Sequence, residues 1–125
     1  MSEARLREEL YGSFKNRGMI YYNMYQTLSA ELGKEKAADL MMQAIYQRGV
    51  EQSKVLQGID NKDVLALMDK FLSIIPDNGT MFGPEVLKAE KNEVDIKFHR
   101  CPLKECCLEA GIPETEVAEL CRIAA

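Results

Sequence analysis

The side chains best suited to chemistry gather late in the chain. From residue 99 onward lie its only histidine, His99, and all four of its cysteines, Cys101, Cys106, Cys107 and Cys121. Imidazole and thiolate serve as base and nucleophile in covalent catalysis, and both are also preferred ligands of zinc. Three kinds of chemistry are therefore open: nucleophilic catalysis, metal binding and, in third place, thiol redox reactions.

Cys101 is the leading candidate for a reactive thiol. It precedes Pro102, and proline is favoured at the first position of a helix, so we expect Cys101 at the N-cap. Unpaired N–H groups and the positive end of the helix dipole favour a thiolate there. If the preceding residues form a strand, His99 lies on the same face as Cys101. We therefore predict Cys101 and His99 as catalytic residues, although a cysteine at an N-cap can also be an ordinary hydrogen-bonding residue.

Zinc is the alternative use of this cluster. Its four ligands would be His99, Cys101, Cys106 and Cys121. The usual two C-x₂₋₄-C pairs are absent, and adjacent Cys106 and Cys107 on a helix should diverge by about 100°. We expect Cys107 to pack with Leu120 and Cys121 as a small hydrophobe. No cofactor is predicted, with zinc kept as the alternative.

A second group of candidates lies in the first half of the chain. Tyr22, Tyr25 and Arg48 place polar tips on otherwise apolar helix faces, which is typical of a small-molecule pocket. A guanidinium would suit an anionic ligand. We predict these three as substrate-binding residues, against the competing interpretation that aromatic side chains at helical spacing form ordinary core.

The elements that must position these residues are mainly helical. Apolar residues recur at helical spacing in three segments, 2–32, 34–56 and 60–75. Asn16-Arg17-Gly18 interrupts the first pattern, which indicates either two helices or one kinked helix. Asp60 is the expected N-cap of the third helix.

A strand pattern follows the helices. In residues 93–101 apolar and polar side chains alternate, and this segment is expected to pair with the residues before Lys91-Asn92 in a hairpin over residues 84–101. Residues 102–125 form two short helices around a tight corner. The predicted fold is a single α+β domain over the whole chain: a mainly helical body, a small antiparallel β-hairpin and two short C-terminal helices.

Composition limits the partners. The net charge is −4, and residues 60–125 hold thirteen acidic against eight basic side chains, so we expect no nucleic-acid partner. Residues 2–10 lack the apolar core of a signal peptide, and no apolar run reaches membrane-spanning length. We expect a cytoplasmic protein with reduced thiols that acts on a small molecule, with no membrane partner. An uncovered apolar stripe on the long helices predicts a homodimer.

Three features together resemble the family of L-2-amino-thiazoline-4-carboxylic acid hydrolases. They are the helix LGKEKAADLMMQAIYQRG (residues 32–49), the sequence Arg100-Cys101-Pro102 where a strand leads into a short helix that ends at Gly111, and Cys121 about twenty residues later. The similarity covers much of the chain from Tyr22 onward. It implies hydrolytic opening of a thiazoline amino acid, on the route to N-carbamoyl-cysteine and cysteine, with Cys101 and Cys121 at equivalent positions.

The sequence thus supports two functions. The first is a hydrolase that opens a small cyclic substrate at a C–N or C–S bond. The second is a non-catalytic module of the same fold that binds a small ligand or a metal, a reading favoured by the lack of a marked acid–base pair of carboxylates.

Overall fold

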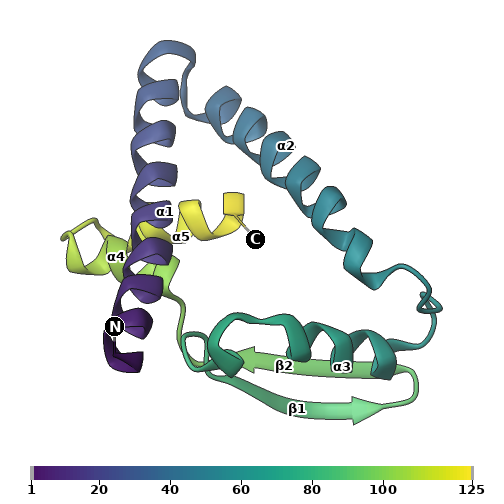
Figure 1. The fold of residues 1–125 in the computed structure, drawn as a ribbon. Helices are drawn as coiled ribbons and strands as arrows, with labels where there is room; N and C mark the ends of the chain where they lie inside the picture. Colours follow the sequence, from purple (N-terminus) through teal and green to yellow (C-terminus); the bar gives the residue numbers. More distant parts are fainter. Residues whose placement is uncertain (1, 125) are drawn as a thin grey trace. The chain divides into compact units, whose positions relative to one another are not determined.

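The computed structural model describes residues 2–124 and divides them into two compact units (Figure 1). The helical unit contains the chain up to Gln52 and again from Pro102 onward, and the hairpin unit is Ser53–Cys101. Within the described residues there are five α-helices and one two-stranded antiparallel sheet. The α+β fold class predicted from the sequence is confirmed.

Two long helices form most of the helical unit. Helix α1 spans Glu3–Leu32, and its N-cap Ser2 accepts a hydrogen bond from the backbone N–H of Arg5. Gly33 ends α1 at φ 86° and donates its N–H to the carbonyl of Ser29. Helix α2 (Lys34–Gln52) starts immediately afterwards and is shorter than predicted, because residues 53–56 form a separate 3₁₀ turn, η1 (Ser53–Leu56).

Two short helices complete this unit. Helix α4 spans Pro102–Glu109 and α5 spans Glu114–Ala124, and both lie across α1 in Figure 1. All four helices contribute to one apolar core, formed by Tyr25, Ala37, Ala38, Met41, Cys106, Cys107, Val117, Leu120 and Ile123. This shared core fixes α5 against α1 and α2.

Gly18 explains the interruption in the apolar pattern of α1. The helix continues through residues 16–18 without a break, so the segment is one helix. A Cβ on Gly18 would lie 2.5 Å from the Sγ of Cys106 and 2.9 Å from the carbonyl oxygen of Leu103. Glycine is therefore required here by the close approach of α4, and it does not mark a helix end.

The hairpin unit begins with helix α3, Val64–Ile74. Its N-cap is Asp63, whose side chain accepts from the N–H of Ala66 at 3.1 Å. The prediction of Asp60 as the cap is wrong. Asp60 instead accepts from the N–H of Lys62, which forms a turn ahead of the helix. After α3 comes a short 3₁₀ turn, η2 (Pro76–Gly79).

Strands β1 (Pro84–Glu90) and β2 (Glu93–Phe98) pair with Pro84 opposite Phe98 and Glu90 opposite Glu93. The register shifts between Val86 and Lys88, which marks a bulge. The predicted hairpin and its turn are confirmed, but β2 ends at Phe98 and does not continue to residue 101. Helix α3 packs against β2, where the ring of Phe98 lies 6.1 Å from that of Phe71.

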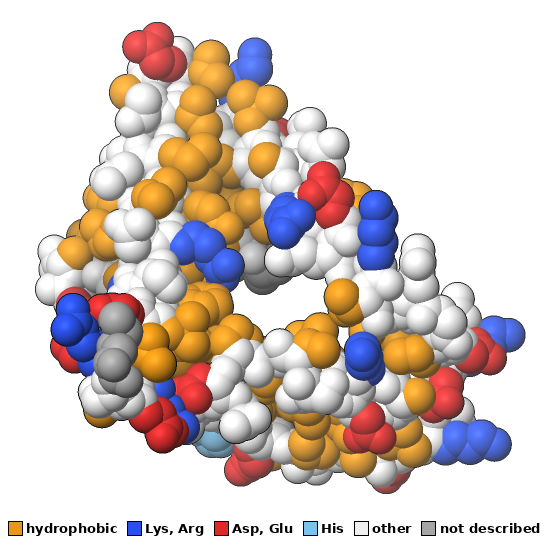
Figure 2. Space-filling view, viewed as in Figure 1, with side chains coloured by type: hydrophobic (Ala, Val, Ile, Leu, Met, Phe, Trp, Pro, Cys, Tyr) orange, Lys and Arg blue, Asp and Glu red, His pale blue; other side chains and the backbone are white. Residues whose placement is uncertain are grey.

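Apolar side chains are not all buried in the helical unit. Figure 2 shows hydrophobic side chains gathered over α1 and α2. Ala37 and Met41 are buried, whereas Leu6 and Leu40 are 52% and 40% exposed. Among the helices in residues 2–124, none combines the length and the apolar character needed to cross a membrane.

Candidate functional site

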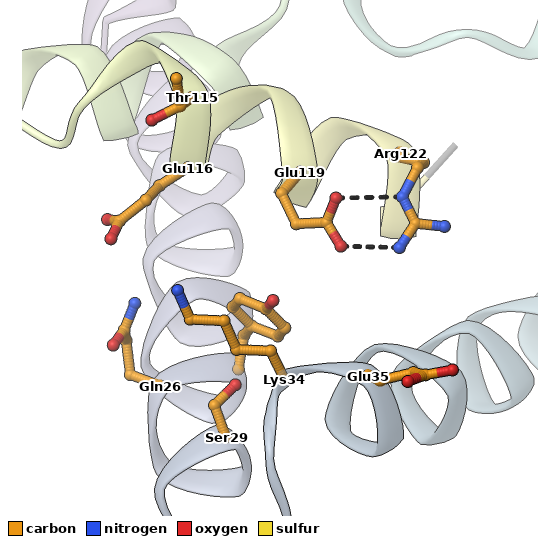
Figure 3. Close-up of a pocket in the computed structure, with 9 residues that line it drawn as sticks. Gln26, Ser29, Lys34, Glu35, Thr115, Glu116, Glu119 and Arg122 are labelled. Atoms are coloured by element: carbon orange, nitrogen blue, oxygen red, sulfur yellow. Dashed lines mark hydrogen bonds and ion pairs between the residues drawn. The ribbon is translucent and has the colours of Figure 1, made fainter.

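A cavity of about 390 Å³ lies between α1, the start of α2 and α5, entirely within the helical unit (Figure 3). We call it the charged cavity. It is lined by Tyr25, Gln26, Ser29, Lys34, Glu35, Thr115, Glu116, Glu119 and Arg122. Five of these nine side chains are charged, and both signs are present. Its volume falls within the usual range for small-molecule sites.

The periodicity of α5 builds one wall of this cavity. Glu116 and Glu119 are three residues apart, as are Glu119 and Arg122, so all three lie on one face of the helix. The adjoining face of α5 is buried through Val117, Leu120 and Ile123. The core therefore turns the polar face of α5 toward α1, and the sharp turn at Gly33 brings the first residue of α2 to the same place.

Glu119 and Arg122, which both line the charged cavity, form an ion pair with each other. The guanidinium donates two hydrogen bonds to the carboxylate, at 2.6 Å and 3.0 Å (Figure 3). These hydrogen bonds lower the pKa of the Glu119 carboxyl against a smaller opposing effect of desolvation, and the charges of Arg122 and Lys34 lower it further. The pKa of Arg122 is raised by the same hydrogen bonds. The pair is thus charged and mutually satisfied.

Glu116 is held by a tyrosine outside the lining set. The hydroxyl of Tyr22 lies 3.4 Å from Oε2 of Glu116 and donates to it. Desolvation raises the pKa of Tyr22, and the negative charge of Glu116 and the hydrogen bond to it raise that pKa further. Tyr22 is therefore a neutral donor that orients one carboxylate oxygen and leaves the other available.

Three polar groups of the cavity have no partner in residues 2–124. The hydroxyl of Ser29 is buried and forms no hydrogen bond. Neither the ammonium of Lys34 nor the amide of Gln26 forms an ion pair or side-chain hydrogen bond within this part of the chain; in Figure 3 the Lys34 amino group lies between Gln26 and α5. Buried polar groups are normally satisfied, so the Ser29 hydroxyl needs an explanation.

The predicted catalytic residues belong to the hairpin unit. His99 and Cys101 follow the end of β2, so the expectation that a strand places them on one face is wrong. The backbone N–H of His99 donates to the carbonyl of Gly83, and its Nε2 lies 3.5 Å from Oε2 of Glu85. Cys101 is half-buried and directly precedes α4, as predicted. Glu85 is a neighbour of His99 that the sequence did not reveal.

The other cysteines differ from expectation in two ways. Cys106 and Cys107 are buried with their sulfur atoms 3.8 Å apart, so the predicted divergence of their side chains does not separate them. Cys121 is exposed, and the predicted packing of Cys121 with Cys107 is wrong; Cys107 packs in the core with Leu120 instead. Over residues 2–124, no three His, Cys, Asp or Glu side chains are grouped to hold a metal ion.

A model of the L-2-amino-thiazoline-4-carboxylic acid hydrolase family matches residues 13–125. The chain belongs to this family. The resemblance inferred from the sequence is confirmed, and the match takes in every residue of the charged cavity as well as His99 and Cys101. No curated protein and no solved structure matches the chain.

In this thiazoline-hydrolase family member, the predicted substrate-binding residues lie in different places. Tyr25 lines the charged cavity and Tyr22 stands behind Glu116. Arg48 does not line it; its guanidinium is exposed and pairs with Glu51 at 2.9 Å. The guanidinium at the cavity belongs to Arg122. The signal for Arg122 in the sequence was its spacing from Glu116 and Glu119 on an amphipathic helix, a pattern that also describes a solvated surface.

The charged cavity has the features of a binding site for a small polar molecule. An internal pair satisfies the charges of Glu119 and Arg122, while Lys34 and Glu116 keep one free cation and one free carboxylate oxygen. Donors and acceptors of both kinds thus face one space. The arrangement is complementary in charge to a small molecule with opposite charges at its two ends.

Proposed function

We propose that the chain is a hydrolase that opens a small cyclic amidine carrying a carboxylate, a substrate of the L-2-amino-thiazoline-4-carboxylic acid type. The observation that carries this proposal is the family match over residues 13–125. A cavity with both signs of charge inside the matched segment supports it, because such a substrate has a carboxylate at one end and a basic amidine at the other.

The reaction consumes one water and involves no change of oxidation state. Water adds to the amidine carbon, which is bonded to the ring nitrogen, the ring sulfur and the exocyclic nitrogen. A base takes a proton from the attacking water. The C–S bond then breaks, the sulfur leaves as a thiol, and the amidine carbon becomes the carbonyl of an N-carbamoyl group. The product is N-carbamoyl-cysteine.

The sequence-based prediction places the reacting side chains at Cys101 and His99. Support for a proton-transfer role of His99 comes from the carboxylate of Glu85, 3.5 Å from Nε2, which can orient the imidazole. The position of Cys101 directly before α4 supports a reactive thiolate. Both roles are proposals that single substitutions test.

The decisive experiment incubates the purified protein with 2-aminothiazoline-4-carboxylic acid and follows its single product in two ways. Release of a new small-molecule thiol is measured by a colorimetric thiol reagent after the protein is filtered off, and N-carbamoyl-cysteine is measured by mass spectrometry. We expect both measurements to give equal amounts, in proportion to protein concentration. Absence of both at high enzyme concentration would contradict the proposed activity.

The alternative proposal is a non-catalytic ligand-binding protein of the same family. The unpartnered groups of the charged cavity favour it, because they suit binding whether or not a reaction follows. Saturable binding of the thiazoline without product formation would support this alternative. Its metal-binding form, with His99, Cys101, Cys106 and Cys121 as ligands, is tested by elemental analysis; less than about 0.1 zinc per chain rules it out, because a structural site holds one ion.

We also propose that the protein is cytoplasmic and acts as a homodimer. The exposed apolar side chains of α1 and α2, among them Leu6, Leu10 and Leu40, support the dimer. Light scattering tests it: we expect twice the chain mass of 14.2 kDa.

A further inference from the structure

We infer that the charged cavity recognises a small zwitterion, with Lys34 binding its carboxylate and Glu116 binding its cationic amidine or ammonium end. The inference deepens the proposed function and rests on it only for the chemical class of the ligand. It assigns roles to two residues that the sequence did not single out.

The cationic end of the site is Lys34. It lines the charged cavity together with Glu119, and its charge lowers the pKa of Glu119, but both oxygens of Glu119 already accept hydrogen bonds from Arg122. The ammonium of Lys34 has no ion pair of its own in residues 2–124. A ligand carboxylate entering the cavity is therefore the natural partner of this cation.

Ser29 lies beside the carbon stem of the Lys34 side chain in Figure 3. Its hydroxyl is buried without a hydrogen-bond partner, and in Figure 3 it is directed toward the Lys34 side chain. A buried hydroxyl that gains no hydrogen bond is unfavourable relative to the same group in water. If the Lys34 side chain shifts when it binds a carboxylate, an oxygen of that carboxylate could accept from Ser29 as well and satisfy the hydroxyl.

The anionic end is Glu116. Tyr22 holds Oε2 at 3.4 Å, so the carboxylate is oriented while Oε1 stays open. In Figure 3 this carboxylate extends toward the α1 side of the cavity, where Gln26 presents its amide. An amidinium has several N–H donors, and the free oxygens of Glu116 and Gln26 are acceptors for them.

The remaining charges do not disturb this polarity. Glu119 and Arg122 neutralise each other, and Glu35 points away from Lys34 in Figure 3. Besides that pair, the charged groups that line the cavity are Lys34, Glu116 and Glu35. With Glu35 directed away, Lys34 and Glu116 present one charge of each sign, an arrangement that complements a zwitterion better than a dianion.

The test compares three probes by calorimetry with wild-type protein. They are 2-aminothiazoline-4-carboxylic acid, which carries both charges, 2-aminothiazoline, which lacks the carboxylate, and 2-oxothiazolidine-4-carboxylic acid, which lacks the amidine. We expect the zwitterion to bind at least about tenfold more tightly than either of the others, since each charged contact is worth on the order of one decade in affinity. Equal affinity for all three probes would overturn the inference.

Two variants then test which residue binds the carboxylate end of the ligand and which binds its amidine end. Lys34→Met should weaken binding of both carboxylate probes by about tenfold and leave that of 2-aminothiazoline unchanged. Glu116→Gln should weaken binding of both amidine probes and spare 2-oxothiazolidine-4-carboxylic acid. Lys36→Met and Glu114→Gln are matched controls, because these side chains lie nearby on α2 and α5 but do not line the charged cavity. Circular dichroism confirms that each variant is folded.

The outcomes separate this inference from the proposed function. Selective zwitterion binding without turnover supports the inference and contradicts the hydrolase. Turnover that is unaffected by Lys34→Met and Glu116→Gln supports the hydrolase and overturns the inference. Losses of equal size in the variants and in their controls also overturn it.

Discussion

The two units of this chain differ greatly in how many apolar side chains they bury. In the helical unit, nine buried residues from four helices form one apolar core. In the hairpin unit, the buried hydrophobic side chain within the described residues is Met81, and α3 meets the sheet through partly exposed aromatic rings such as Phe71 and Phe98. A lone two-stranded hairpin with one helix has little apolar surface to bury.

This difference bears on where a ligand can be held. Recognition of a ligand needs side chains that their surroundings hold in place. The side chains that line the charged cavity come from helices that share the apolar core of the helical unit. His99 and Cys101 instead follow the last strand of the hairpin unit, where His99 is about half exposed. The helical unit therefore offers the better-supported binding site, while the two predicted catalytic residues, His99 and Cys101, lie in the other unit.

The largest expected effect is on turnover. It tests whether residues of the hairpin unit carry out the reaction. Cys101→Ser and His99→Gln should each reduce kcat for the thiazoline by at least about a hundredfold if these side chains act as nucleophile and base. Neither residue lines the charged cavity, so such a loss would mean that the substrate reacts outside that cavity, within reach of Cys101 and His99.

Cys121→Ser is the matched control for that experiment. Cys121 is an exposed thiol on α5, at a separate cavity with Lys104, and its substitution should leave kcat unchanged. Equal activity of Cys101→Ser and the wild type would remove Cys101 from the mechanism.

The second largest effect is on stability. It comes from a substitution that disturbs the packing of α4 against α1 in the helical unit. Gly18→Ala should lower the free energy of unfolding by about 2 kcal/mol, because the added methyl group meets the Leu103 backbone and the Cys106 sulfur. Gly12→Ala is the control on the same helix. Nothing lies within 4 Å of its Cβ, and it should raise stability by about 0.5–1 kcal/mol through helix propensity. Urea titration measures both, and a stabilising Gly18→Ala would mean that α4 is not packed this closely.

Most of the fold could be predicted because it depends on local patterns. Apolar spacing located the helices and the alternation of residues 93–98 located the hairpin, since both follow from the geometry of single elements. The errors arose where two neighbouring signals compete or where tertiary packing decides. Asp60 and Asp63 are both suitable caps, and the interruption at Gly18 was a close helix contact.

The charged cavity was harder to predict, for a physical reason. Lys34 and Glu116 are 82 positions apart in the sequence, and nothing local relates them. They meet only because α1, α2 and α5 share a core. Tyr22 and Tyr25 could be found, since a polar tip on an apolar face is visible in one helix, whereas Arg122 looked like any charged residue on a helix surface.

A smaller effect on ligand affinity tests whether Tyr22 orients the carboxylate of Glu116. Tyr22→Phe removes the donor that orients Glu116, so amidine probes should bind about threefold more weakly, while 2-oxothiazolidine-4-carboxylic acid is unaffected. Tyr21→Phe is the neighbouring control and should bind all three probes like the wild type. An equal loss for every probe would mean that Tyr22 supports the fold and not the orientation of the carboxylate.

The smallest effect concerns acid stability of the wall formed by Glu119 and Arg122. Because the folded-state pKa of Glu119 lies below its ordinary value of 4.5, the ionised carboxylate favours the folded protein above that pH, and this contribution is lost as the pH falls through the lower folded pKa. Glu119→Gln should therefore flatten the decline of urea stability below about pH 4.5 by a small amount, since the pair is partly exposed to solvent. Glu114→Gln on the same helix is the control and should keep the wild-type slope, because Glu114 is not part of the Glu119–Arg122 pair. If the two variants share one slope, the ion pair does not contribute to folding, and the wall of the cavity depends on the apolar face of α5 alone.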